Sequence, residues 1–167
     1  MSALFVKVAS LPVICGIELA FAGSFLPSTL EGYQTFFNTI VTEADFQEAY
    51  FGRASVGFSE ESELTAAGHT YKQKLVITFP SGGNSRAVRL DTIVKAKFIK
   101  IKLSDNRHLL MGRNDFEQNA RPKIQVKTDE RMAQVQFETV SISPLGYTPP
   151  VNEGGLPAFI PINLFEE

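Results

Sequence analysis

Between Tyr71 and Ile142, apolar residues recur first at every second position, then at helical spacing, then at every second position again. Alternation places apolar side chains on one face of a strand, whereas intervals of three and four place them on one face of a helix. The pattern predicts strands at about 71–79, 97–103, 108–112, 123–128 and 132–142, with one helix near 85–95. Turn residues at 104–107 and 128–131 join the last four strands into two hairpins. We therefore expect a mainly β, α+β fold: an antiparallel β-sandwich or barrel with one packed helix.

The last of these strands contains a one-residue slip. Its inward apolar face ends at Phe137 and resumes at Val140, out of step with the alternation. An extra residue in one strand of an antiparallel pair produces such a slip. The sequence thus predicts a β-bulge near Glu138 and Thr139.

The N-terminal region contains two short apolar stretches, at 4–8 and 13–21, separated by Pro12. Each alternates as a strand does, and proline interrupts sheet pairing, so we expect two strands. Within the second stretch, Cys15 is the only cysteine of the chain. A single cysteine excludes an intramolecular disulfide and a CxxC zinc or redox site, and we expect Cys15 to be a small apolar residue of the core.

Periodicity is weak between Gly23 and Gly68, a stretch that carries several phenylalanines. We expect a long inserted loop or arm at about 23–68, with a strand within 33–41. Around Phe46 two structures remain open: a short helix begun by a capping box at 42–45, or further β-structure extending through Phe58. A long segment of this kind in a small domain commonly has a function, and contact with a neighbouring subunit is one.

The composition changes after Ser143, where five of the nine prolines lie among glycines and large apolar residues. A disordered tail is poor in large apolar residues, and proline keeps a segment extended while excluding it from helices and central strands. Residues 144–167 are therefore predicted to form an extended arm that lies on a surface, either of its own domain or of a neighbouring subunit. A chain of 167 residues favours one domain, which we expect at 1–143.

Residues that carry catalysis or bind metals are sparse in this sequence. Neither histidine, His69 or His108, belongs to a recognisable nucleophile–base or metal-ligand arrangement, and we interpret both as surface residues. The glycine-containing stretch 82–86 lacks the motifs of phosphate-binding loops and is interpreted as a turn that caps the helix. The acidic run at 59–63 lacks the ligand spacing of a calcium loop. We expect no enzyme activity, and no catalytic, cofactor-binding or metal-binding residues.

Lys95, Lys97, Lys100 and Lys102 form the only basic cluster, and the last two should share a strand face with Phe98. Basic residues beside an aromatic ring can contact single-stranded nucleic acid. Charged residues on a strand can also form a plain solvated face that discourages edge pairing. The formal net charge of −2 gives no general attraction to nucleic acid. We favour the solvated face, with a single-stranded nucleic-acid-binding β-barrel as an alternative.

One part of the chain resembles a known family. The strand Val76–Pro80 (VITFP), the helix with Arg89 and Leu90, and the hairpin Phe98–Gly112 (FIKIKLSDNRHLLMG) resemble small virion proteins of tailed phages and prophages of Bacteroidota. The matching hairpin residues are Leu103, Asp105, Asn106, Leu110 and Gly112. The resemblance covers about 74–143. It implies a component of the phage tail or head–tail neck with a tail-tube-like build, and it transfers no active-site residues.

The expected function is that of a structural subunit of a viral particle, a tail or head–tail neck component that forms a ring or tube. A capsid auxiliary protein is the alternative within assembly. The expected partners are further copies of the chain and other virion proteins, with nucleic acid present only as the enclosed genome. We expect synthesis in the host cytoplasm, location in the virion, and neither a signal peptide nor a membrane span. The candidate intersubunit contacts are Phe36, Phe37, Leu156, Phe159, Ile160, Ile162, Leu164 and Phe165.

Overall fold

Nine strands and one helix make up the part of the chain that the structure, a computed structural model, describes: residues 12–23, 46–49, 56–112 and 120–148. In chain order the elements are β1 (Ile14–Ala20), β2 (Phe46–Ala49), β3 (Val56–Thr65), β4 (Gly68–Pro80), α2 (Arg86–Ile93), β5 (Phe98–Leu103), β6 (His108–Met111), β7 (Lys123–Thr128), β8 (Met132–Ser141) and β9 (Tyr147–Thr148). The strands predicted at 4–8 and within 33–41 lie outside the described residues.

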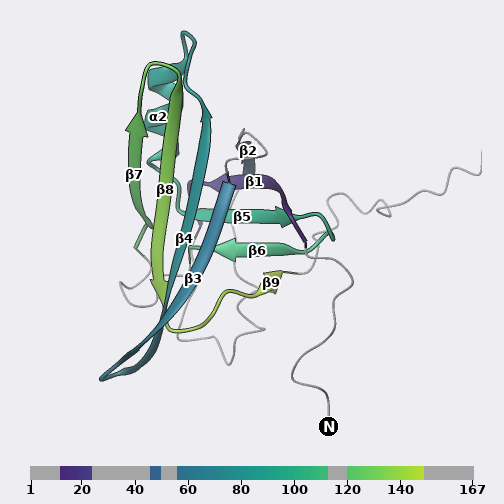
Figure 1. Ribbon diagram of the computed structural model, residues 1–167, viewed down its shortest axis with the longest axis vertical. Helices are drawn as coiled ribbons and strands as arrows, with labels where there is room; N and C mark the ends of the chain where they lie inside the picture. Colours follow the sequence, from purple (N-terminus) through teal and green to yellow (C-terminus); the bar gives the residue numbers. More distant parts are fainter. Residues whose placement is uncertain (1–11, 24–45, 50–55, 113–119, 149–167) are drawn as a thin grey trace, which may run out of the picture.

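The strands form two antiparallel sheets. One has five strands in the order β2-β1-β5-β6-β9, and the other has four in the order β3-β4-β8-β7. Figure 1 shows the two sets of strands crossing at a steep angle, as in sandwiches with orthogonal packing. No strand pair among the described residues joins one sheet to the other. The prediction of a mainly β sandwich with one helix is confirmed, and the barrel alternative is wrong.

The core lies between the two sheets. In the four-stranded sheet, Leu75 lies opposite Phe137 and Ile77 lies opposite Val135, in a register between β4 and β8 that runs without interruption. Ile99 and Ile101 of β5 pack against these side chains from the other sheet. Burial of each such side chain contributes about 1.5–3 kcal/mol. The alternating apolar residues of 71–142 thus form the core that their spacing predicts.

Helix α2 lies at one end of the four-stranded sheet and packs on the core through Leu90 and Ile93. Ser85 occupies the N-cap position, but its side chain makes no capping hydrogen bond. The amide of Arg86 bonds to the carbonyl of Gly83 instead, which keeps the turn in place. Because the helix has only eight residues, packing rather than intrinsic helix stability must hold it.

The β-bulge predicted near Glu138 and Thr139 is absent, because the β4–β8 register continues through both residues. The inward face of β8 does not slip; it changes from apolar to polar, and Thr139 and Ser141 are buried. Thr139 lies opposite Gln73, which is also buried, so this end of the interior is lined by polar side chains. The irregularity in register lies elsewhere, in β1 between Ile14 and Gly16.

Two described segments of the predicted arm at 23–68 are strands, which is the β alternative that the sequence left open. Phe46–Ala49 is strand β2, which also rules out the helix alternative there, and Val56–Thr65 is strand β3. Both pair along their whole length, with β1 and β4 respectively. The pairing of β4 with β8 stops at Tyr71. Between Tyr71 and Gly68, β4 pairs with β3 alone, and the two strands form a hairpin that projects from the sandwich (Figure 1).

The C-terminal arm also begins later than predicted. Leu145 packs against the core, and Tyr147–Thr148 pairs with β6 as the edge strand β9. The amide of Leu145 donates a 2.8 Å hydrogen bond to Oε2 of Glu60. Residues 144–148 therefore belong to the folded domain, and the rest of the predicted arm, 149–167, lies outside the described residues.

Candidate functional site

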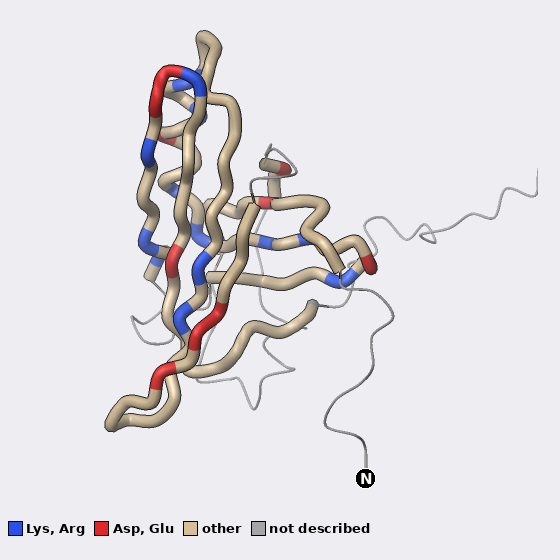
Figure 2. Tube along the Cα trace, viewed as in Figure 1, with Lys and Arg blue, Asp and Glu red and all other residues tan. Residues whose placement is uncertain are grey.

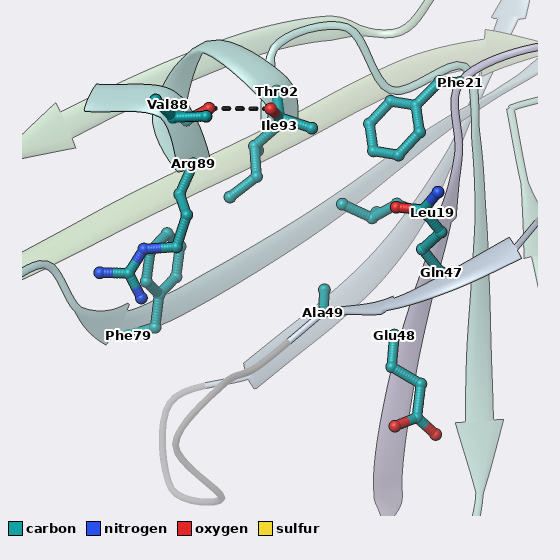
Figure 3. Close-up of a pocket in the computed structure, with 10 residues that line it drawn as sticks. All are labelled: Leu19, Phe21, Gln47, Glu48, Ala49, Phe79, Val88, Arg89, Thr92 and Ile93. Carbon is teal, nitrogen blue, oxygen red and sulfur yellow. Dashed lines mark hydrogen bonds between the residues drawn. The ribbon is translucent and has the colours of Figure 1, made fainter. Parts of the chain in front are cut away.

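A cavity of about 210 Å³ opens between helix α2 and the ends of strands β1, β2 and β4 (Figure 3). We call it the α2 groove. It forms where three parts of the chain that are distant in the sequence meet: the β1–β2 pair brings Gln47 beside Leu19, and β4 is followed after a short turn by α2. The residues that line it are Leu19, Phe21, Gln47, Glu48, Ala49, Phe79, Val88, Arg89, Thr92 and Ile93.

The floor of the groove is apolar. Leu19, Phe79 and Ile93 belong to or pack on the core between the sheets, so the groove is an extension of that core to the surface. Val88 lies at its mouth and is 68% exposed. Open pockets with apolar floors and few polar groups are the usual sites at which proteins receive a ligand or an anchoring side chain.

Three cations lie at or beside the rim of the groove: Arg89 lines it, whereas Arg121 and Lys97 flank its Phe21 end without lining it. Arg89 donates to the carbonyl of Gly82 at 3.0 Å, Arg121 donates to the carbonyl of Phe21 at 3.2 Å, and Lys97 Nζ donates to the carbonyl of Gly23 at 2.6 Å. Within the described residues, none of these three cations is paired with a carboxylate. Carbonyl oxygens orient the cations without cancelling their charge, so this rim favours an anionic partner.

One acidic residue, Glu48, also borders the groove. Its side chain points away from the cavity in Figure 3, and its Oε1 lies 3.8 Å from Lys102 Nζ on the other face of the five-stranded sheet. Figure 2 shows Lys and Arg along β7 and around α2, whereas the acidic residues of β3 lie towards the projecting hairpin. Arg89, Arg121 and Lys97 thus outnumber Glu48 around the groove, and Asp91 of α2 is paired with Lys95.

The lysine face predicted on β5 is not solvated. Lys100 is only 8% exposed, its Nζ lies 3.0 Å from Glu18 Oε2, and it sits 4.1 Å from the ring centroid of Phe46. Lys102 also forms an ion pair with Glu18, which is buried. The aromatic residue expected beside them, Phe98, is fully buried. The described residues therefore do not present the exposed lysine–phenylalanine surface on which nucleic-acid binding was considered.

The ion pairs set the protonation of Glu18. Burial by itself would raise the pKa of its carboxyl group, but hydrogen bonds from Lys102 and Lys100, together with their charges, hold that pKa below its ordinary value of 4.5. Gly16 leaves room for this arrangement, because a Cβ atom there would lie 3.2 Å from Cδ of Lys102. Because Gly16 has no side chain, the aliphatic part of Lys102 lies over it on the way to the Glu18 carboxylate.

The remaining polar candidates, His69, His108 and Glu60, do not lie together in one site. His69 is exposed near the tip of the projecting hairpin and His108 begins β6 in the other sheet, so the two lie far apart in the fold. Glu60 accepts hydrogen bonds from Gln73 Nε2 at 3.1 Å and from the Leu145 amide, which ties β3 to β4 and to the segment before β9. Among the described residues, no three His, Cys, Asp or Glu side chains are gathered as metal ligands would be.

The expectation that Cys15 lies in the core is wrong. The register irregularity of β1 turns this residue outward, and its thiol is exposed, 3.5 Å from the carbonyl oxygen of Lys102. The glycine turn 82–86 does precede the helix as predicted, with Gly83 at a φ of 114°. The carbonyl of Gly82, the first residue of this turn, accepts a hydrogen bond from the side chain of Arg89.

The predicted intersubunit residues, Phe36, Phe37 and the six apolar residues between Leu156 and Phe165, lie outside the described residues. The groove itself was not predicted. A signal for it was present at Val88, an apolar residue of the predicted helix that is not among the helix residues packed on the core. Such an apolar residue on the solvent side of a short helix indicates a contact surface when others gather around it.

In the part of the chain that the structure describes, no helix is long and apolar enough to cross a membrane. Comparison with protein-family models, curated proteins and solved structures found no match to this chain.

Proposed function

We propose that this chain is a structural, self-associating subunit of a tailed-phage particle, a tail or head–tail neck component that assembles as a ring or tube. The observation that carries self-association is the α2 groove, an open apolar surface with cations at and beside its rim. The resemblance of 74–143 to small virion proteins supports the phage assignment within that class.

A second feature of the same chain favours assembly. The segment 149–167 contains Leu156, Phe159, Ile160, Ile162, Leu164 and Phe165, which are too many large apolar side chains to remain favourably in water. Burial of several of them would be worth several kcal/mol at about 25 cal/mol per Å². A ring of subunits provides further contacts that raise the effective concentration of such a segment near its binding surface.

A capsid auxiliary protein remains the second candidate, since it also needs an apolar contact surface. A nucleic-acid-binding barrel has lost its main support, because Lys100 and Lys102 are paired with Glu18 and Phe98 is buried. The sandwich is also open rather than closed. An exposed, uncompensated lysine face would be required for that function.

The test compares the full chain with a chain that ends at Thr148. We expect the full chain to show a mass above that of the 18.4 kDa monomer in light scattering over a range of concentrations, and rings or tubes in electron micrographs. The shortened chain should be folded and have a lower association state. The control is Asn152→Ser, which alters the removed segment without changing its apolar residues. A full chain that stays monomeric at all concentrations contradicts self-association.

A further inference from the structure

We propose that the α2 groove binds residues 162–167 of a neighbouring copy of this chain. Leu164 and Phe165 would enter the apolar floor, and Glu166 and Glu167 would face the cations of the rim. The inference rests on the proposed self-association and names the two surfaces that meet. Because an arm and its receiving groove are different surfaces, the contact is head to tail and can generate a ring or an open tube.

The size of the groove suits an aromatic anchor. A dry cavity of about 150 Å³ lined by aliphatic and aromatic side chains holds a benzene ring. The α2 groove offers about 210 Å³ and is lined by Leu19, Phe79 and Ile93, with Val88 at its mouth. It therefore accommodates the ring of Phe165 and part of a second apolar side chain.

Charge complementarity selects this end of the segment. The chain follows its last apolar pair, Leu164 and Phe165, with two glutamates. The groove places an apolar floor beside Arg89 and, around Phe21, Arg121 and Lys97. An apolar-then-acidic sequence matches an apolar floor with a cationic rim, and complementary charges fix register and orientation at such contacts.

β9, where the described chain ends, and the groove lie at opposite edges of the five-stranded sheet. β9 and β2 are the opposite edges of the five-stranded sheet, separated by four strand spacings, or roughly 19 Å at 4.7–4.9 Å each. β9 also pairs with the start of β6, at the end of the sheet away from Phe21.

Disulfide mapping tests this contact in the full chain. Cys15 is the only cysteine, so a Cys15→Ser background carries no thiol. In that background, a protein with Val88→Cys is mixed with a protein with Phe165→Cys and oxidised. The matched control is Val94→Cys, an exposed valine just beyond α2 that does not line the groove. We expect the groove variant to form at least roughly tenfold more mixed dimer than the control, because docking raises the effective concentration of the thiols.

The outcomes separate this contact from other arrangements. If Val88→Cys and Phe165→Cys in one chain close only within a monomer, the arm covers its own groove and the proposal fails. It also fails if Phe37→Cys, rather than Phe165→Cys, reacts with Val88→Cys, because then the 24–45 segment is the occupant. Light scattering on the unsubstituted full chain distinguishes the two levels: association of that chain without a Val88–Phe165 bond in the variants overturns the contact alone, and absence of its association overturns the proposed function as well.

Discussion

Lys100 Nζ lies 3.0 Å from Glu18 Oε2 across the paired strands β5 and β1, and both side chains are almost entirely buried. Lys102 approaches the other carboxylate oxygen of Glu18, so one buried anion serves two cations. Removing one partner of a buried pair leaves an uncompensated charge, which is costlier than replacing the whole pair by apolar residues. This cluster therefore makes Glu18 important for the five-stranded sheet.

Replacing Glu18 by Gln should lower the free energy of unfolding by about 3–5 kcal/mol, since Lys100 then stays buried without a counter-charge. Chemical denaturation followed by circular dichroism measures the change. The control is Glu61→Gln, an exposed glutamate of β3, which should alter stability by no more than about 0.5 kcal/mol. Equal effects of the two substitutions would show that the buried pairing contributes nothing specific.

Stability should also fall in acid. The pKa of Glu18 is held below its ordinary value of 4.5, so the folded state binds its proton less readily than the unfolded state. A depressed carboxyl pKa contributes stability that is present above the unfolded-state pKa and is lost as pH falls through the folded-state pKa. We expect the free energy of unfolding to decrease as pH drops below about 4.5, with a shallower decrease in Glu18→Gln. Identical pH profiles for the two proteins would contradict this assignment.

Gly112 follows β6 at a φ of 124°, and a Cβ atom there would lie 2.5 Å from the Lys97 carbonyl oxygen. Gly112→Ala combines backbone strain with this clash and should cost about 2–4 kcal/mol of unfolding free energy. Gly57→Ala is the matched control in β3, where a Cβ would meet no atom within 4 Å. That change should be neutral or stabilise the protein by up to about 1 kcal/mol. Thermal unfolding of both variants measures the difference.

The hydroxyl of Thr139 is buried in the structure, with no hydrogen-bond partner among the described residues. Thr139→Val keeps the shape and removes this polar group, so the free energy of unfolding should stay equal or rise by about 1 kcal/mol. The control is Thr92→Val, which removes a 2.8 Å hydrogen bond to the carbonyl of Val88 on an exposed helix face. The free energy of unfolding of this control should be unchanged or slightly lower. A clear loss of stability in Thr139→Val would mean that the hydroxyl makes a favourable interaction.

The alternation of 71–142 was enough to predict the helix and five strands because their inward positions are apolar. For β3 the sequence offered β-structure only as an alternative and only as far as Phe58. Its inward face has two apolar residues, Val56 and Phe58, and then Glu60, which bonds to Gln73 and the Leu145 amide. The same polar end of the interior explains the bulge that was predicted and is absent. Alternation alone cannot distinguish a slip in register from a buried threonine.

The charge cluster and the groove depend on contacts between distant parts of the chain. Lys100 has the spacing of a solvated strand residue, and only its pairing with Glu18 of β1 explains its burial. The α2 groove likewise brings together Leu19, Phe79 and Ile93 from three elements. Local spacing in the sequence does not show which residues of distant elements come into contact. The sequence could therefore indicate apolar contact residues but not the surface that binds them.

Two truncations should separate the folded domain from the arm. A chain that ends at Thr148 keeps β9 and the Leu145 contacts, and its unfolding free energy should be within about 0.5 kcal/mol of that of a full chain studied at a concentration where it is monomeric. A chain that ends at Ser143 loses the packing of Leu145 and its bond to Glu60, which should cost about 2–4 kcal/mol. Chemical denaturation of both chains gives the comparison. Equal stability would place the boundary at Ser143, as the sequence predicts, whereas a loss confined to the shorter chain places it after Thr148.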